Sequence, residues 1–199
     1  ILNKSILKAR GDYLIFTDGD CIPRSDFVRR HIEFRQTGCF LSGGYVKLPR
    51  HVSLAITDRH IRAGDFARRD WLREQGLGRF QNLRKLTLRG HWATLFNRIS
   101  RTRAGWHGHN ASCWKTDALR VNGFDERMGW GGEDREFGHR LVNSGIRGIR
   151  IRYSAICLHL YHQRPWRDEE VLARNDRIRW NAENSDTSDT QFGIRQLAD

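Results

Sequence analysis

Short apolar runs separated by polar turns predict the strands of an α/β fold. Tyr13–Phe16 is apolar, aromatic and β-branched over four residues, which fits a buried strand better than a helix. Strand character returns over Cys39–Leu48, where two adjacent glycines interrupt it, and again over His109–Trp114. Ile149–Leu160 first alternates and then becomes continuously apolar, so we expect a final strand there.

Helical spacing of apolar residues fills much of the remaining chain. Leu2 and Ile6 share one stripe of a first helix, and Phe137 and Leu141 share one stripe of a later helix that Gly145 ends. We expect helices over residues 1–9, 23–36 (with Pro23 at the start), 116–121, 133–145 and 166–180, and basic helices over 55–72 and 80–99. Residues 181–199 are polar enough to form a loosely held tail.

Two carboxylates stand just past the end of the first strand. Asp18 and Asp20 are separated only by Gly19. Ligands bind at this edge of open α/β sheets, and two acids held so close repel each other unless a cation or a shared proton relieves them. A divalent metal bound to a phosphorylated substrate is the simplest relief. Ordinary turn chemistry explains the same tripeptide, because Asp bonds its own backbone and Gly accepts a positive φ.

A second acidic group follows a glycine-rich loop. Trp130 lies among three glycines, the last of which is Gly132, and Glu133, Asp134 and Glu136 follow in the first turn of a helix. The helix dipole stabilises acids at this position, which is sufficient to explain them structurally. It does not explain why a tryptophan flanked by glycines precedes them. The loop is therefore a candidate binding element.

A histidine pair ends the last expected strand. His159 and His162 are three residues apart, on nearly opposite faces of an ideal strand, but they can converge where the strand breaks into a loop. Imidazole is the commonest nitrogen ligand for metals. By itself such a pair is more often structural than metal-binding.

The composition limits the partners. A formal net charge of +12 over 199 residues favours polyanions, whether nucleic acid, an anionic membrane face or acidic glycans, without choosing among them. Arginines interleaved with aromatics in residues 51–103 could form a nucleic-acid surface. Solvated helices explain that pattern better, so we expect no nucleic acid. The four cysteines are far apart in the sequence, which favours reduced thiols and a cytoplasmic location.

These motifs, in this order, resemble those of the GT-A glycosyltransferases, specifically the family-2 bacterial enzymes with a galactosyltransferase-like carboxyl-terminal catalytic region. The resemblance rests on Asp18-Gly19-Asp20, the block Gly129–Asp134 and the late histidine pair, and it covers about residues 1–165. The leading Asn3-Lys4 and Ala9–Asp12 also look like the helix before the metal strand of that family. It implies a mixed sheet flanked by helices.

The resemblance also implies roles for individual residues. The metal, Mn²⁺ or Mg²⁺, would be held by Asp20, His159 and His162. In related enzymes a methionine takes the place of the first histidine, and a nitrogen and oxygen set suits Mn²⁺ better. Asp134 would be the catalytic base, and Glu133, the second catalytic candidate, would help to hold the acceptor or the donor sugar. The donor sugar nucleotide would contact Asp18, Asp20 and Gly132, and the acceptor would contact Trp130 and Asn110.

The implied activity is metal-dependent, inverting transfer of a hexose or N-acetylhexosamine from a nucleotide sugar, most simply a UDP-sugar. The acceptor would be a glycan or lipid-linked glycan of bacterial surface polysaccharide or lipopolysaccharide, and the basic surface fits an enzyme at the anionic inner membrane face. A retaining route through Glu133 stays open. Two other hypotheses are a polyanion-binding module and a metal-dependent phosphohydrolase.

The expected domain spans residues 1–180, with 51–103 as a basic helical insertion or acceptor region and 181–199 as the tail. The resemblance also implies that the domain is incomplete at its amino terminus. Strands that form much of the uridine pocket in this fold have no counterpart before Ile1. We therefore expect residues 1–199 to transfer sugar poorly by themselves.

Overall fold

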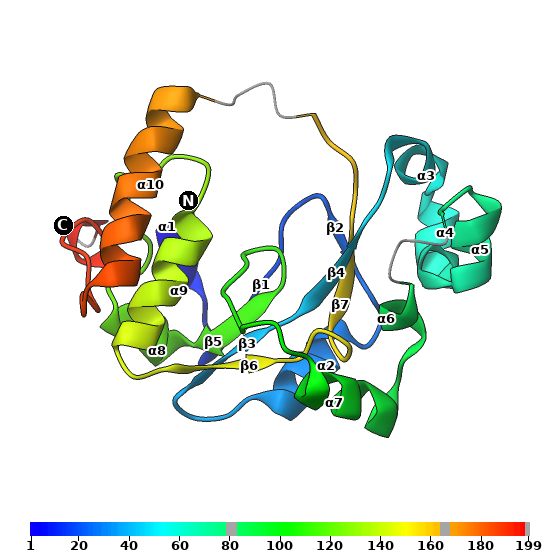
Figure 1. Ribbon diagram of the computed structural model, residues 1–199, viewed down its shortest axis with the longest axis horizontal. Coiled ribbons are helices and arrows are strands. Elements are labelled where there is room, and N and C mark those ends of the chain that lie inside the picture. The colour runs from blue at the N-terminus through cyan, green and yellow to red at the C-terminus, as the bar shows by residue number, and fades with distance from the viewer. Residues whose placement is uncertain (79–82, 164–167, 198–199) are drawn as a thin grey trace.

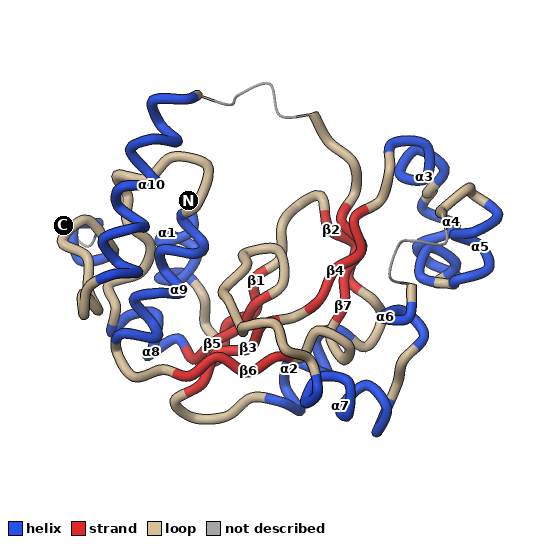
Figure 2. Tube along the Cα trace, in the orientation of Figure 1, coloured by secondary structure: helices blue, strands red, loops and turns tan. Residues whose placement is uncertain are grey.

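The strands of the computed structural model form two small sheets with helices packed around them (Figure 1; Figure 2). The structure describes residues 1–78, 83–163 and 168–197. The first sheet contains β1 (Tyr13–Phe16), β3 (Cys39–Ser42), β5 (Ala111–Trp114) and β6 (Arg147–Arg150), in the order β1-β5-β3-β6. The second contains β2 (Cys21–Pro23), β4 (Gly44–Lys47) and β7 (Ile156–His159), in the order β2-β7-β4.

Parallel and antiparallel pairs occur in both sheets. The pairs β3–β6 and β4–β7 are parallel, and the pairs β1–β5, β3–β5 and β2–β7 are antiparallel. The expectation of a mixed α/β fold flanked by helices is confirmed, and the arrangement is compatible with a GT-A-like fold.

The first predicted strand is correct in its bounds but wrong in its burial. Of the four residues of β1, only Leu14 is buried, and the other three are half-buried. The reason is position, because within the described chain β1 pairs with β5 alone and forms an edge of its sheet. An edge strand keeps one side open to ligand or solvent.

The chain passes from the first sheet to the second at Gly43. A Cβ atom there would lie 1.8 Å from Oδ1 of Asn110, and one on Gly44 would lie 2.1 Å from the carbonyl oxygen of Arg152. Both positions therefore require glycine because protein atoms approach closely, and no room is left there for a ligand.

The prediction of a single strand over Ile149–Leu160 is wrong. The structure has two strands there, β6 in the first sheet and β7 in the second, separated by a turn at residues 151–155. In that turn, the amides of Ser154 and Ala155 donate to the carbonyl oxygen of Ile151 at 2.9 Å. Residues 149–160 contain no proline or glycine to mark a break, so the division into two strands was not visible in the sequence.

The helices of the outer layers agree with the expected segments closely at α1, α8 and α9, and differ from them elsewhere. The helix expected from Pro23 begins only at Phe27, and Pro23 itself belongs to β2. The region of basic helices is divided into short pieces, whose buried residues, such as Phe66, Leu72 and Leu86, share one apolar cluster with residues of β4 and β7. The first residues of the helices expected over 80–99 and 166–180 lie outside the described residues. The helices are α1 (Leu2–Lys8), α2 (Phe27–Phe34), α3 (Arg50–Ala55), α4 (Asp58–Ala63), α5 (Arg69–Glu74), α6 (Arg84–Thr87), α7 (Gly90–Ile99), α8 (Lys115–Arg120), α9 (Glu133–Asn143) and α10 (Glu169–Asn184), with 3₁₀ turns at Asp65–Ala67 and Ile194–Leu197.

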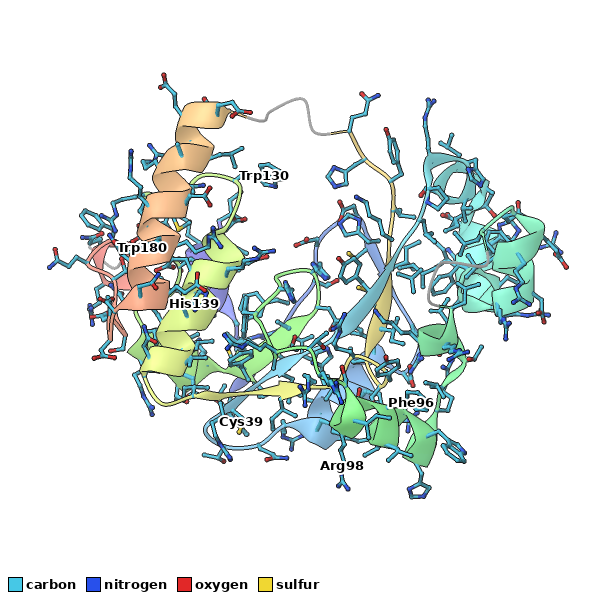
Figure 3. The ribbon with its side chains drawn as sticks, in the orientation of Figure 1. Cys39, Phe96, Arg98, Trp130, His139 and Trp180 are labelled. Atoms are coloured by element: carbon cyan, nitrogen blue, oxygen red, sulfur yellow. The ribbon has the colours of Figure 1, made fainter. Side chains whose placement is uncertain are left out.

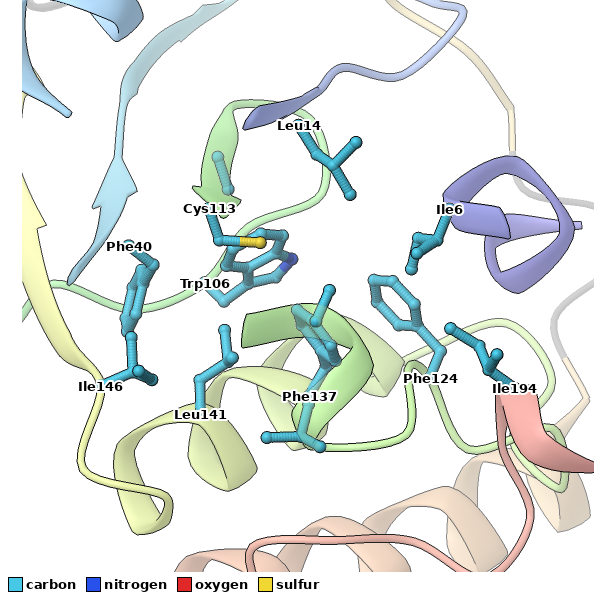
Figure 4. Packing of buried hydrophobic residues seen from close by; sticks show 13 residues of the cluster. Ile6, Leu14, Phe40, Trp106, Cys113, Phe124, Phe137, Leu141, Ile146 and Ile194 are labelled. Atoms are coloured by element: carbon cyan, nitrogen blue, oxygen red, sulfur yellow. The ribbon is translucent and has the colours of Figure 1, made fainter. Parts of the chain in front are cut away.

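The main core lies between the first sheet and α9, where aromatic rings meet edge to face or stacked (Figure 4). The ring centroids of Trp106 and Phe137 are 4.8 Å apart, and those of Phe124 and Phe137 are 4.3 Å apart. Such aromatic pairs contribute about 0.5–1.5 kcal/mol each beyond their buried area. The base of α9, which carries the candidate acids, is therefore held rigidly.

The prediction that residues 181–199 are loosely held is wrong for the part that the structure describes. Helix α10 continues to Asn184, and the following chain returns to the core, where Ile194 is 5% exposed. The hydroxyl of Thr190 donates to Asp125 at 2.7 Å, and the backbone amide of Arg195 donates to the side-chain oxygen of Asn122 at 2.8 Å. Polar composition alone suggested a tail, but buried hydrogen bonds and one anchoring isoleucine fix it.

Candidate active site

A cleft of about 870 Å³ opens beside the carboxyl end of β1. Its apolar half follows β1 and α1 and is lined by Leu2, Ile6, Leu14, Phe16 and Phe124. Its polar half brings together Asp18, Asp20, Trp130, Gly132, Glu133, Asp134, His159 and His162. Residues more than a hundred positions apart in the sequence thus share one cavity, as the motifs predicted.

The carboxylates of Asp18 and Asp20 lie on a tight turn between β1 and β2. The backbone amide of Cys21 donates to the carbonyl oxygen of Asp18 at 3.1 Å, which closes the turn. Burial raises the pKa of Asp18, and the negative charge of Asp20 raises it further. Two acids in this arrangement repel each other, and a bound cation would relieve that repulsion.

The two histidines face Asp20 with the same ring nitrogen. Nε2 of His162 lies 3.2 Å from Oδ2 of Asp20, and Nε2 of His159 lies 3.8 Å from Oδ1. The Nδ1 atoms are placed to donate to the backbone carbonyls of Leu160 and Gln163, at 2.9 and 3.0 Å. That second hydrogen bond fixes the tautomer in which Nε2 carries a lone pair, which is how metal-binding imidazoles are oriented.

These residues fit a divalent cation. Ligand atoms bound at about 2.1 Å from a metal lie about 3 Å apart. The Nε2 atom of His162 is 3.2 Å from Asp20, whereas that of His159 is 3.8 Å away and the centroids of the two imidazole rings are 5.4 Å apart. One carboxylate and two imidazoles form the nitrogen and oxygen set that suits Mn²⁺, Zn²⁺ or Fe²⁺. The convergence that an ideal strand forbids is achieved because β7 ends at His159 and the chain turns away.

Cys21 lies near the same group but differs in direction. Its Sγ atom, an oxygen of Asp20 and a nitrogen of His159 all lie within 4.8 Å of one another. However, Cys21 does not line the cleft and packs instead toward Cys157 in a separate apolar cluster. A hydrogen bond with the Cys157 thiol, together with burial, strongly raises the pKa of Cys21. The Sγ atom of Cys21 nevertheless lies 3.7 Å from Oδ1 of Asp20, so Asp20, Cys21 and His159 form a group with metal-ligand spacing, and His162 faces the same carboxylate from the cleft.

Asp134 lies at the start of α9 and is held from outside its helix. Its Oδ2 atom accepts a hydrogen bond from the backbone amide of Gly108 at 2.8 Å. A Cβ atom on Gly108 would lie 2.6 Å from the carboxylate, so only glycine permits this approach. Burial raises the pKa of Asp134 to about 6, and the charges of Glu133 and Asp18 act in the same direction. A carboxylate with this pKa is suited to accept a proton near neutral pH.

Glu133 is engaged with the loop before its own helix. Its Oε2 atom accepts from the backbone amide of Gly131 at 2.6 Å. Gly131 and Gly132 have φ values of +109° and +90°, which other residues rarely adopt. The loop carries Trp130, which is 40% exposed and extends from the loop toward the space between α9 and β7 (Figure 3). Glu133 therefore shapes the loop that presents the tryptophan.

Sequence reasoning missed the residue that holds this loop from behind. Asn175 of α10 is 1% exposed, and its Nδ2 atom lies within hydrogen-bonding reach of the carbonyl oxygens of Gly129, Trp130 and Gly131, at 3.3, 3.3 and 2.9 Å. Leu172 and Val171 pack against the glycines themselves. An asparagine in a polar helix gives no sequence signal for such a contact.

Asn110, expected to contact the acceptor, lies elsewhere. It is fully buried, and its Nδ2 atom donates to the carbonyl oxygens of Gly44 at 2.7 Å and Ala155 at 3.1 Å. Its Oδ1 atom is 3.0 Å from Nε2 of His31, whose other nitrogen is 2.7 Å from Ser112 Oγ. The structure does not bring Asn110 into the cleft. It joins the two sheets beneath it.

A comparison with known families agrees with this geometry. The mixed α/β fold is compatible with a glycosyltransferase-like domain. More particularly, the family described as the N-terminal domain of galactosyltransferase matches residues 94–163, a segment that includes Trp130, Asp134 and both histidines. Asp18 and Asp20 lie outside the matched segment. No protein in a search of curated proteins matches the chain. The similarity supports glycosyltransferase activity in general terms, with a nucleotide-sugar donor and a glycan acceptor.

Proposed function

We propose that the chain is the catalytic region of a metal-dependent, inverting glycosyltransferase of the GT-A family-2 type that uses a UDP-hexose or UDP-N-acetylhexosamine. The observation that carries the proposal is one cleft that holds both a metal-fitting trio, Asp20, His159 and His162, and a carboxylate with a pKa of about 6, Asp134. Glycosyl transfer from a nucleoside diphosphate needs these two parts, one for the leaving group and one for the acceptor.

The metal trio would hold the diphosphate end of the donor. When bound there, Mn²⁺ or Mg²⁺ would neutralise the negative charge that develops on the leaving diphosphate. Asp18, next to Asp20 on the turn, would contact the ribose or the sugar, and the backbone of Gly132 would contact the donor. The raised pKa of Asp18 fits a site designed to be completed by positive charge.

Asp134 would remove the proton from the acceptor hydroxyl as it attacks the anomeric carbon. The Gly108 amide fixes the carboxylate on one side, and Trp130 offers a flat apolar face on which a sugar ring can stack. Glu133 is held by Gly131, so we assign it to positioning the loop. One base without an enzymic nucleophile inverts the configuration, so an α-linked donor yields a β-glycoside.

The wider setting belongs to the same proposal. Residues 1–180 form the transferase domain, with 51–103 as its basic helical region and the acceptor a glycan or lipid-linked glycan of bacterial surface polysaccharide or lipopolysaccharide. The cytoplasmic face of the inner membrane is the proposed location. The apolar half of the cleft, along the edge strand β1, is where a donor would be accommodated.

The test separates metal binding from nucleotide binding. Mn²⁺ is titrated into the protein and followed by the loss of its free-ion electron paramagnetic resonance signal, and UDP is then titrated by calorimetry with and without Mn²⁺. We expect Asp20→Ala and His162→Ala to lose Mn²⁺ binding, and Asp20→Ala to lose metal-dependent UDP binding. Asp12→Ala is the matched control, because that carboxylate is exposed and lies outside the cleft lining.

Equal Mn²⁺ binding by the wild type and Asp20→Ala would overturn the metal assignment. Release of inorganic phosphate from a nucleotide sugar, without transfer or UDP formation, would favour a phosphohydrolase instead.

A further inference from the structure

Helix α7 exposes an apolar stripe that no other described element covers. Trp92, Leu95 and Ile99 are 66%, 44% and 60% exposed, and their spacing of three and seven residues places them along one side of the helix. Single exposed apolar residues are common, but three in register on one short helix form a contiguous surface.

The rotation of α7 is fixed by its opposite side. Ala93 and Asn97 are buried, and the side chain of Asn97 donates to the Ser154 hydroxyl at 2.8 Å while accepting from the backbone amide of Tyr153 at 2.8 Å. The helix cannot turn its apolar stripe inward without breaking both hydrogen bonds. The stripe is therefore a permanent feature of the surface.

The chain around this stripe is strongly basic. Residues 83–103 contain no acidic residue, and their six cations amount to half of the formal net charge of +12. Arg98 at the end of α7 points outward (Figure 3), and neither it, Arg101 nor Arg103 forms an ion pair with any other described residue. The six cations are Arg84, Lys85, Arg89, Arg98, Arg101 and Arg103.

Two further arginines add to the charge beside this segment. Arg150 donates to the carbonyl oxygen of Thr102 at 2.6 Å, and Arg152 donates to its hydroxyl at 2.5 Å. These bonds hold the chain after α7 against β6, so Arg101 and Arg103 are presented on a fixed backbone.

We propose that α7 and residues 100–103 form a docking surface for an anionic lipid bilayer. An amphipathic helix with an apolar stripe, an indole and flanking arginines is suited to the interface between head groups and acyl chains. A nucleic acid would satisfy the arginines but leave Leu95 and Ile99 in water. A second copy of the chain in a symmetric contact would bring arginines against arginines. A bilayer with anionic head groups satisfies both the charges and the apolar stripe.

The docking surface does not include the cleft, so it can bind lipid whether or not the cleft is an active site. Only its biological purpose rests on the proposed function, because docking would bring the cleft close to a lipid-linked acceptor. None of the described helices is long and apolar enough to cross a membrane. One helix of ten residues with three apolar contacts gives reversible attachment.

The experiment measures flotation of the whole chain with vesicles of phosphatidylcholine alone and of an equimolar mixture of phosphatidylcholine and phosphatidylglycerol. We expect binding to the anionic vesicles that weakens as salt is raised, and little binding to the neutral ones. Each cation near an anionic surface contributes about fivefold, so Arg98→Gln/Arg101→Gln/Arg103→Gln should weaken binding about 100-fold. Trp92→Ser should weaken it about tenfold or more.

Matched controls lie on other faces of the protein. Trp180→Ser removes an indole of similar exposure, 63%, from α10. Arg10→Gln/Arg174→Gln/Arg177→Gln removes the same charge from exposed positions elsewhere. Both should retain binding within a few-fold. Circular dichroism and the Mn²⁺ titration show whether each variant is folded with an intact cleft, so failure of this proposal is distinguishable from failure of the proposed function.

Three outcomes would overturn the docking surface. They are equal binding to neutral and anionic vesicles, unchanged binding by folded Trp92→Ser, and a dimer in sedimentation velocity without lipid that Trp92→Ser abolishes.

Discussion

Replacing Asp134 by asparagine should remove activity and at the same time make the protein more stable. The asparagine side chain keeps the shape of the aspartate, and its oxygen can still accept a hydrogen bond from the backbone amide of Gly108. In the wild type that amide is 2.8 Å from Oδ2 of Asp134. What it loses is the negative charge that burial disfavours. The pKa of Asp134 is raised from 3.8 to about 6, and each unit corresponds to about 1.4 kcal/mol. The charge therefore costs up to about 3 kcal/mol of folding free energy at neutral pH.

The sign of this effect depends on pH. Because the folded protein binds the proton more tightly than the unfolded chain, the cost is fully present above pH 6 and disappears as pH falls toward 4. Asp134→Asn should therefore raise the melting temperature near pH 7.5, by about 2–4 °C per kcal/mol, and match the wild type near pH 4.

Activity should change in the opposite direction. Loss of a general base costs about 10²–10⁴-fold in rate. The assay is UDP release from UDP-hexoses with Mn²⁺, using either an acceptor or water as the attacking hydroxyl. In the wild type the rate should rise with pH and level off above about 6, and in Asp134→Asn that step should vanish. A variant that is stabilised yet fully active would refute the assignment of Asp134 as the base, and a variant that is destabilised would refute the origin of its pKa in burial.

Two further predictions concern the residues around the cleft. Asn175→Ala removes the donor that holds three loop carbonyls, so we expect faster proteolysis at residues 129–132 and a raised KM for the acceptor. Asn184→Ala, at the exposed end of the same helix, is the control. Equal proteolysis of the two variants would contradict the prediction. His31 has a pKa lowered to about 4 by burial, so its stabilising effect is present above pH 6.5 and is lost as pH falls toward 4, by about 1.4 kcal/mol per unit. Urea unfolding at pH 7 and pH 5 should show a smaller loss of stability in His31→Gln than in the wild type, because the other titrating groups, such as His109 and Asp134, contribute equally to both proteins. Identical pH slopes in both would disprove it.

Local signals in the sequence identified the strands and the chemistry-bearing residues. Each motif can be recognised from a few consecutive residues. The motifs are the apolar run Tyr13–Phe16 followed by two acids, the glycine loop with Trp130, and the histidine pair. Their order along the chain was sufficient to predict a mixed α/β fold and a common site. The periodicity of strands and helices depends on residues that are near one another in the sequence, so it can be recognised without a structure.

Contacts between segments that are distant in the sequence cannot be recognised in this way, and they decided how the strands divide into two sheets and which polar residues are buried. The sheet divides at Gly43 because Asn110 occupies the space a side chain would need, and no pattern near either residue records that contact. The same asparagine was misread as a ligand residue because its burial depends on elements more than forty positions away.

The sequence by itself determined which residues carry the chemistry of this protein, and the tertiary structure decided how each of them behaves. An aspartate has the same formula anywhere in a chain, but the pKa of Asp134 is raised to about 6 only because the fold buries its carboxylate. His159 and His162 become a metal-fitting pair only where two backbone carbonyls fix their tautomers. Protonation, orientation and access depend on desolvation and on long-range packing, which are properties of the folded chain.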